Sequence, residues 1–321
     1  MDGLTHYPHG VHALDSGYGR PALAAVYIVV EQGRAAIIDA GTNASVPRIL
    51  SALAVLGVAP TAVDWVLLTH VHLDHAGGAG SLMGALPQAR LLVHPRGLRH
   101  MMDPGKLWEG VSAVYGAERA YQLYGHLLPI DPERMMPATD GLEIRLADRV
   151  FRVFDTPGHA RHHVCFWDGQ ARAFFTGDTF GLSYRELDVD GRAFVVPTTT
   201  PSQFDPQALH QSIDRMLALE PQTMYLTHFG GVSDVHRLAD DLHRLIDTMV
   251  VMAQAARGDG VARHVEILAS LEQLIREEVG RQGWALDEEQ SLALLRNDLE
   301  LNAQGLGVWL DSLAQAATGS A

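Results

Sequence analysis

The sequence predicts a layered protein of the α+β class. Apolar runs of strand length recur through residues 1–232 and alternate with segments of helical periodicity. Some of these runs are joined by tight turns and others are separated by helices, which indicates both antiparallel and parallel pairing. After residue 232 the pattern is helical only. We therefore expect two domains, residues 1–232 and residues 233–321.

The expected elements of the first domain follow in chain order. Turns at Gln32-Gly33 and at residues 168–170 each join two strands. A helix is expected over 205–219, with Asp205 as its N-cap and Pro206 at its first position. Another helix covers 47–56, and residues 96–136 form an insertion rich in Met, Trp and Tyr. The expected strands are 24–30, 35–39, 63–68, 90–94, 150–154, 164–167, 171–176 and 222–226.

The second domain is expected to consist of helices. Leu238, Leu242 and Leu245 recur at helical spacing, as apolar residues also do over 261–275. Another helix begins at Asp287, where Gln290 three residues later completes a capping-box pattern. These apolar stripes predict a packed helical unit.

Composition limits the classes of function. The chain has 321 residues, 47% of them hydrophobic, so it can bury a full core. Its net charge of -14 argues against nucleic acid as a partner. No stretch is apolar enough for a membrane span, and the start does not resemble a signal peptide. Cys165 is the only cysteine, which excludes an internal disulfide and favours a cytoplasmic location.

The richest motif runs from Thr69 to Gly78 and contains His70, His72, Asp74 and His75. It follows the apolar strand at 63–68. Because side chains alternate along an extended chain, His70 and His72 can point the same way and chelate one ion. Asp74 and His75 come where the chain turns, so they can face a neighbouring position. Imidazole and carboxylate together suit zinc, iron or manganese.

Further ligand-type residues stand where other strands end. His159, Asp178 and His228 each lie in a glycine-containing loop that follows an apolar strand. Loops at one end of a sheet converge, so these residues are expected to meet the first motif at one site.

This set of motifs resembles the metallo-β-lactamase-fold hydrolases over about residues 15–232. The resemblance implies a four-layer αββα sandwich as the catalytic domain, with an added C-terminal helical unit. It implies that Asp39 supports the metal loop from beneath. The chain would hold two divalent ions, zinc first and iron or manganese as alternatives. Of the ligands, His70, His72 and His159 would hold one ion, Asp74, His75 and His228 the other, and Asp178 would bridge them.

The resemblance to the glyoxalase II-like and lactonase-like branches implies a hydrolase. A metal-bridging hydroxide would cleave a small ester, thioester or lactone, with Asp74 as the catalytic residue that orients it or shuttles a proton. Two alternatives stay open. One is an iron-dependent oxidoreductase similar to the sulfur dioxygenases, and the other is a phosphodiesterase or nuclease of the same superfamily.

Substrate contacts are expected outside the ligand set. Tyr184 and Thr199, the latter in the loop 198–201, are candidates to contact the substrate, and the 96–136 insertion lines the entrance or forms a helical flap. Thr69 and Thr227 are expected to support the ligand histidines. The expected partner is a small-molecule substrate, with no nucleic acid and no membrane. A homodimer formed through the helical tail is left open.

Overall fold

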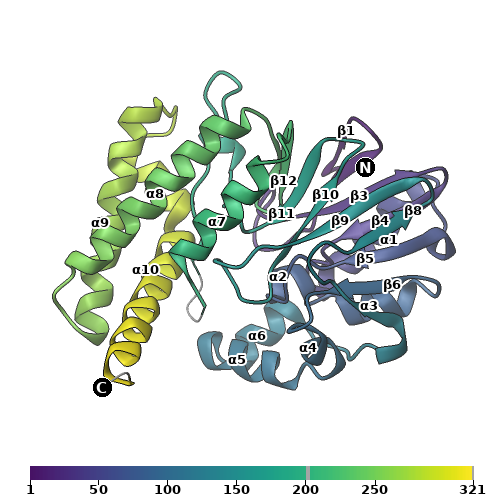
Figure 1. The fold of residues 1–321 in the computed structure, drawn as a ribbon, viewed down its shortest axis with the longest axis horizontal. Helices are drawn as coiled ribbons and strands as arrows, with labels where there is room; N and C mark the ends of the chain where they lie inside the picture. The colour runs from purple at the N-terminus through teal and green to yellow at the C-terminus, as the bar shows by residue number, and fades with distance from the viewer. Residues whose placement is uncertain (200–202, 320–321) are drawn as a thin grey trace. The chain divides into compact units, whose positions relative to one another are not determined.

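The computed structural model describes residues 1–199 and 203–319 and divides the chain into two compact units. The first, here called the sheet unit, comprises Met1–Asp155, His162–Gly177 and Glu220–Val232. The second, the helical unit, comprises Thr156–Arg161, Asp178–Leu219 and Ser233–Ala321. Figure 1 shows the strands of the sheet unit and the long helices α8, α9 and α10 of the helical unit. The expected division at residue 232 into a catalytic and a helical domain stays a prediction.

One sheet of the sheet unit follows chain order from β1 to β7. The strands β1 to β4 pair antiparallel, and β4 to β7 pair parallel. Four of these strands, β3 to β6, overlap the predicted runs, whereas β1, β2 and β7 were not predicted. The strands are β1 (Leu4–Tyr7), β2 (Val11–Asp15), β3 (Ala25–Glu31), β4 (Arg34–Ile38), β5 (Val63–Leu67), β6 (Arg90–Val93) and β7 (Met135–Pro137).

The other sheet has the order β13-β12-β11-β10-β9-β8. Only β11 and β12 pair parallel, because the chain between them leaves the sheet. The predicted strand 222–226 is confirmed as β12, but the expectation that it is the last strand was wrong, since Gly230–Val232 forms an additional strand against it. The strands are β8 (Glu143–Leu146), β9 (Arg149–Asp155), β10 (Val164–Asp168), β11 (Ala173–Gly177), β12 (Thr223–Leu226) and β13 (Gly230–Val232).

Alternating side chains of β3 explain why the two sheets stack. Val26 and Ile28 belong to a core shared with helices α1 (Val46–Val55) and α3 (Ala79–Ala85). Ala25, Tyr27 and Val29 point to the other face and belong to a core shared with Phe151, Phe166 and Phe175 of the second sheet. A strand buried on both faces reads as a continuous apolar run, as this one does.

The 96–136 insertion is a helical flap. It contains α4 (Leu98–Met102), α5 (Gly105–Tyr115) and α6 (Ala117–Tyr124). Met101 belongs to the core shared with α1 and α3, Tyr124 is buried and Tyr121 is exposed, so the aromatic and methionine residues of the insertion divide between the interior and the surface. Short 3₁₀ turns at Asn43–Ser45, Pro60–Ala62, Pro132–Arg134 and Arg185–Leu187 connect other elements.

The helical unit contains α7 (Pro206–Leu217), α8 (Val235–Ala255), α9 (Gly260–Gln282) and α10 (Glu288–Gly319). The predicted caps are confirmed. Asp205 accepts a hydrogen bond from the Ala208 amide at 3.0 Å, and Asp287 and Gln290 exchange bonds of 2.8 and 3.1 Å. Leu238, Leu242 and Leu245 are buried in α8. No helix in the described ranges is long and apolar enough to cross a membrane.

The predicted fold class is therefore confirmed. Two mixed sheets are flanked by helices, and further helices follow at the C-terminus. The parallel strands β4 and β5 end at Ile38 and Leu67, and the segments that follow them carry Asp39 and four of the predicted ligands, His70, His72, Asp74 and His75.

Candidate metal centre

The loop after β5 brings two histidines together. The strand ends at Leu67, Thr69 lies in a bend, and His72 has extended backbone angles and directly precedes the short helix α2 (Leu73–Ala76). His70 Nε2 and His72 Nδ1 lie 2.8 Å apart. Both histidines lie past the end of the strand, in the loop. Their donor atoms therefore meet as expected, but not through the alternation of an extended strand.

Asp74 and His75 lie on α2 and meet His228 from the loop after β12. Asp74 Oδ2 is 3.5 Å from His75 Nε2 and 3.3 Å from His228 Nε2. One ligand atom from each residue lies within 4.8 Å of the other two. Two imidazoles and a carboxylate are a donor set that zinc and other first-row metals bind, so these residues fit a metal ion.

Asp39 lies beneath this loop at the end of β4, as expected. Its carboxylate accepts hydrogen bonds from the Thr69 amide at 2.9 Å, the Thr227 hydroxyl at 3.0 Å and His75 Nδ1 at 2.8 Å. The Thr69 hydroxyl bonds it as well, at 2.9 Å. One buried carboxylate therefore joins the loops that follow β4, β5 and β12.

Two further ring nitrogens of the ligand-type histidines in the sheet unit have defined partners. His228 Nδ1 donates to the Leu23 carbonyl at 2.8 Å, and His70 Nδ1 lies 3.1 Å from the Thr69 hydroxyl. A hydrogen bond on Nδ1 fixes the tautomer in which Nε2 carries the lone pair for a metal. The expected support by Thr69 is direct, while Thr227 acts through Asp39.

Gly177 at the end of β11 is required by the close packing of this region. Its φ is +48°, and a Cβ there would lie 2.5 Å from His163 Nε2 and 2.7 Å from Thr69 Cβ. The His163 ring stacks on His70 with the centroids 4.8 Å apart. A glycine at this point therefore allows the histidines to pack against the strand end.

The helical unit contributes a separate pair, His159 and Asp178. His159 Nε2 is 3.3 Å from Asp178 Oδ2, and both residues are buried. Thr198 supports the pair, because its hydroxyl lies 2.8 Å from His159 Nδ1 and 3.5 Å from the Asp178 carbonyl. The structure thus groups the seven predicted ligands as five residues of the sheet unit and two of the helical unit.

Two phenols of the sheet unit lie within electrostatic reach of Asp74. The hydroxyls of Tyr18 and Tyr124 are 3.0 Å apart. Burial is the main cause that raises the pKa of each phenol, and the negative charge of Asp74 raises both further. Both phenols are therefore protonated at neutral pH. Tyr124 belongs to the insertion named from the sequence. Tyr18 was missed, because a lone tyrosine before a strand carries no pattern.

The insertion also contacts helix α2 through apolar side chains. A narrow pocket in the sheet unit is lined by Leu73 and Ala76 of α2 and by Met101, Leu107 and Leu128. Asn43 holds the end of α6 by donating to the carbonyls of Tyr124 and His126 at 2.7 and 2.8 Å.

The two predicted substrate contacts are bound to helix α10. The Tyr184 hydroxyl bonds both carboxylate oxygens of Asp298 at 3.1 Å. Thr199 is buried and bonds Asn302 through its amide at 2.7 Å and its hydroxyl at 3.1 Å. Thr200 and Pro201 of the same loop lie outside the described residues. The substrate roles of Tyr184 and Thr199 stay predictions.

Fold and site together define a class of metal-binding α/β sandwich proteins whose ligands lie in loops at strand ends. The model of the metallo-beta-lactamase superfamily matches residues 19–228. The chain therefore belongs to the metallo-beta-lactamase superfamily, as its motifs indicated.

Individual relatives agree with this assignment. The chain is 29% identical over 229 residues to the metallo-beta-lactamase fold-containing protein ST1585 of Sulfurisphaera tokodaii, covering 70% of this chain and 80% of that protein. It is 31% identical over 199 residues to a hydroxyacylglutathione hydrolase of Xanthomonas euvesicatoria pv. vesicatoria, covering 61% and 56% of the two chains. The crystal structure of ST1585 superposes with a TM-score of 0.61 at 25% identity and covers 89% of this chain and all of that one.

Proposed function

We propose that this protein is a dinuclear metal-dependent hydrolase that cleaves a small ester, thioester or lactone. The observation that carries the proposal is the group of Asp74, His75 and His228, whose ligand atoms gather within 4.8 Å of one another above the buried carboxylate of Asp39. A carboxylate bonded to the far nitrogen of a ligand histidine is the usual support of a metal site in proteins.

The proposed ligand set has two halves. His70, His72 and His159 hold one divalent ion, and Asp74, His75 and His228 hold the other. Asp178 bridges the two ions. The close pairs formed within each unit, His70 with His72 and His159 with Asp178, support this arrangement. Zinc is the proposed metal because imidazole and carboxylate donors suit it, with iron or manganese as the alternatives.

The chemistry follows from the residues around the ions. Two bound divalent cations would activate a shared water and polarise the oxygen of the scissile group. Asp74 keeps 23% of its side chain exposed, so its carboxylate can accept a proton from water and return one to the leaving group. In the pair of neutral phenols one hydroxyl donates to the other, so the second O–H group of Tyr18 and Tyr124 can donate a hydrogen bond to a substrate oxygen.

The proposed substrate class rests on similarity and on charge. Several relatives at 26–31% identity are named hydroxyacylglutathione hydrolases, and that name describes hydrolysis of a thioester. A net charge of -14 disfavours nucleic acid, so we propose a small-molecule substrate and not a nuclease. We also propose that the protein acts in the cytoplasm, away from membranes. A homodimer is a separate proposal that the oligomeric state in solution tests.

The test is a hydrolysis screen on metal-free protein that has been reloaded with zinc, manganese or iron. Lactones, thioesters, aryl esters, phosphodiesters and β-lactams are compared, and oxygen uptake is followed in parallel. We expect hydrolysis of a lactone, thioester or ester that needs metal and consumes no oxygen. Oxygen uptake with an iron-loaded protein would instead establish the dioxygenase alternative.

Variants make the same test specific to the site. Asp74→Asn is expected to lower kcat by at least a hundredfold, as loss of a general acid–base group does. His264→Ala is the matched control, because His264 is a half-buried histidine of α9 that pairs with Glu300. An Asp74→Asn protein with unchanged activity would refute the role of Asp74.

A further inference from the structure

Helix α10 is bonded to the loop 197–199 through one buried side chain, Asn302. Its Oδ1 accepts from the Thr199 amide at 2.7 Å, and its Nδ2 donates to the Pro197 carbonyl at 3.0 Å. The Thr199 hydroxyl donates to the Asn302 backbone carbonyl at 3.1 Å. Asn302 is 2% exposed, so water does not compete for these bonds. The backbone is therefore fixed on both sides of Thr198.

Thr198 is the residue that touches the predicted ligands. Its hydroxyl lies 2.8 Å from His159 Nδ1, and its carbonyl oxygen lies 3.3 Å from the same nitrogen. When Nδ1 carries the proton it donates to Thr198, and the Thr198 hydroxyl can then donate to the Asp178 carbonyl 3.5 Å away. This direction leaves the lone pair on His159 Nε2, the nitrogen that faces Asp178.

We propose that Asn302 is a positioning residue for the metal ligand His159 and acts on it through Thr198. The inference rests on the proposed function, in which His159 holds a metal ion. Every contact in this relay lies within the helical unit. The C-terminal helix therefore has an indirect part in the proposed metal centre, because through Thr198 it sets the tautomer and orientation of one ligand.

The relay predicts an effect on one metal ion only. Groups that hold a ligand histidine in place contribute about tenfold to a hundredfold to metal affinity. Loss of the Asn302 side-chain bonds would weaken the ion bound by His159. The ion bound by Asp74, His75 and His228 is supported instead by Asp39 and Leu23, so its affinity would not change.

The test measures the two zinc dissociation constants of the full chain by competition with a chromophoric chelator. Asn302→Leu keeps the approximate size of the side chain and removes both of its hydrogen bonds. Leu306→Ala is the matched control, since Leu306 is fully buried one turn further along α10. We expect Asn302→Leu to raise one dissociation constant tenfold to a hundredfold. We expect Leu306→Ala to lower thermal stability and leave both constants within about twofold, well below that range.

Two further variants separate the proposal from its premise. Thr198→Val removes the hydroxyl itself and is expected to weaken the same ion even where Asn302→Leu does not fold, whereas Thr198→Ser should restore binding. His159→Ala should lose that ion. If His159→Ala loses one ion while Asn302→Leu and Thr198→Val bind both with wild-type constants, the relay is refuted. If His159→Ala itself binds both ions normally, the proposed ligand set is wrong.

Discussion

Asp39 accepts a hydrogen bond from His75 Nδ1 at 2.8 Å, and both side chains are almost completely shielded from solvent. The aspartate follows β4 and the histidine lies on α2, so the bond joins two residues that are 36 positions apart in the chain. Because Nδ1 is engaged, His75 presents Nε2 towards Asp74. The orientation of a proposed ligand is therefore set from below by a residue that does not touch the metal position.

Asp39→Asn is expected to disrupt this arrangement. An amide can accept from the Thr69 amide but presents an N–H group to one of the remaining donors, so one buried donor loses its partner. We expect a loss of about 1–3 kcal/mol in the free energy of unfolding of the metal-free protein. Zinc affinity should fall about tenfold to a hundredfold. Urea unfolding and zinc titration measure both effects, and Asp64→Asn, in the partly exposed ion pair with Arg34, is the control.

Gly177→Ala is expected to damage the site through steric overlap. The new Cβ would lie 2.5 Å from His163 Nε2 and would occupy a backbone conformation with φ of +48°. Gly33→Ala is the matched control, because Gly33 has φ of +77° and no atom within 4 Å of a Cβ. Both variants carry the cost of positive φ for a residue with a Cβ, about 1–2 kcal/mol. A Gly177→Ala protein that unfolds at the same urea concentration as Gly33→Ala would contradict the packing described for His163.

Tyrosine ionisation predicts how stability changes at high pH. Burial is the main cause that raises the pKa of Tyr18, Tyr124 and Tyr225, the last to about 12. Below pH of about 10 these phenols are neutral in both folded and unfolded chains. Above that pH the unfolded chain ionises first, so stability falls as pH rises.

Urea unfolding at pH 9 and pH 11 measures this fall. Tyr124→Phe removes one of the groups and should make the fall smaller, while Tyr121→Phe, at a ring that is 51% exposed, should leave it unchanged. Equal falls in the wild type and in Tyr124→Phe would show that Tyr124 ionises normally in the folded protein.

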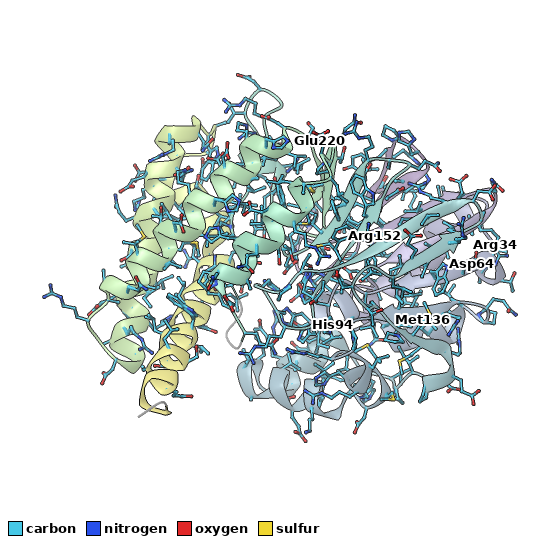
Figure 2. All side chains as sticks on the ribbon, viewed as in Figure 1. Arg34, Asp64, His94, Met136, Arg152 and Glu220 are labelled. Atoms are coloured by element: carbon cyan, nitrogen blue, oxygen red, sulfur yellow. The ribbon has the colours of Figure 1, made fainter. Side chains whose placement is uncertain are left out.

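A buried ion pair and an exposed one should differ sharply in their contribution to stability. Arg149 donates to Asp168 at 3.0 Å through Nε, and neither side chain is exposed. Arg149→Met leaves a buried carboxylate without its cation, and we expect a loss of about 3–5 kcal/mol. Arg34 and Asp64 form the comparison at the surface (Figure 2), where Arg34→Met should cost about 0–1 kcal/mol. Chemical unfolding of both variants decides whether burial sets the difference.

Local patterns were sufficient to predict most of the strands and helices. The run at 63–68 became β5, and the capping pattern at Asp287 and Gln290 forms as expected. The hairpin of β1 and β2 was missed because Pro8, Gly10 and three histidines interrupt any alternation. β13 was missed because Gly230 and Gly231 read as a turn, and only pairing with β12 makes them a strand.

The residues that hold the ligands in place were harder to predict than the ligand-type residues themselves. His70, His72, Asp74 and His75 are close in sequence, so their spacing alone indicates a metal motif. The Leu23 carbonyl that bonds His228, by contrast, lies 205 residues away, and Asn302 lies 103 residues from Thr199. Such contacts depend on tertiary packing, and neither residue has a chemical type that marks it in advance.

The most direct test of the central claim is the metal content of the chain measured together with its hydrolytic activity. Zinc is added stepwise to metal-free protein, and bound metal is measured by mass spectrometry after dialysis. We predict two zinc ions per chain, with hydrolysis of an ester, thioester or lactone that appears as they bind. The Asp178→Ala protein should retain fewer than two ions and lose that activity. A chain that binds no zinc, or that hydrolyses the substrate equally well without it, would contradict the account.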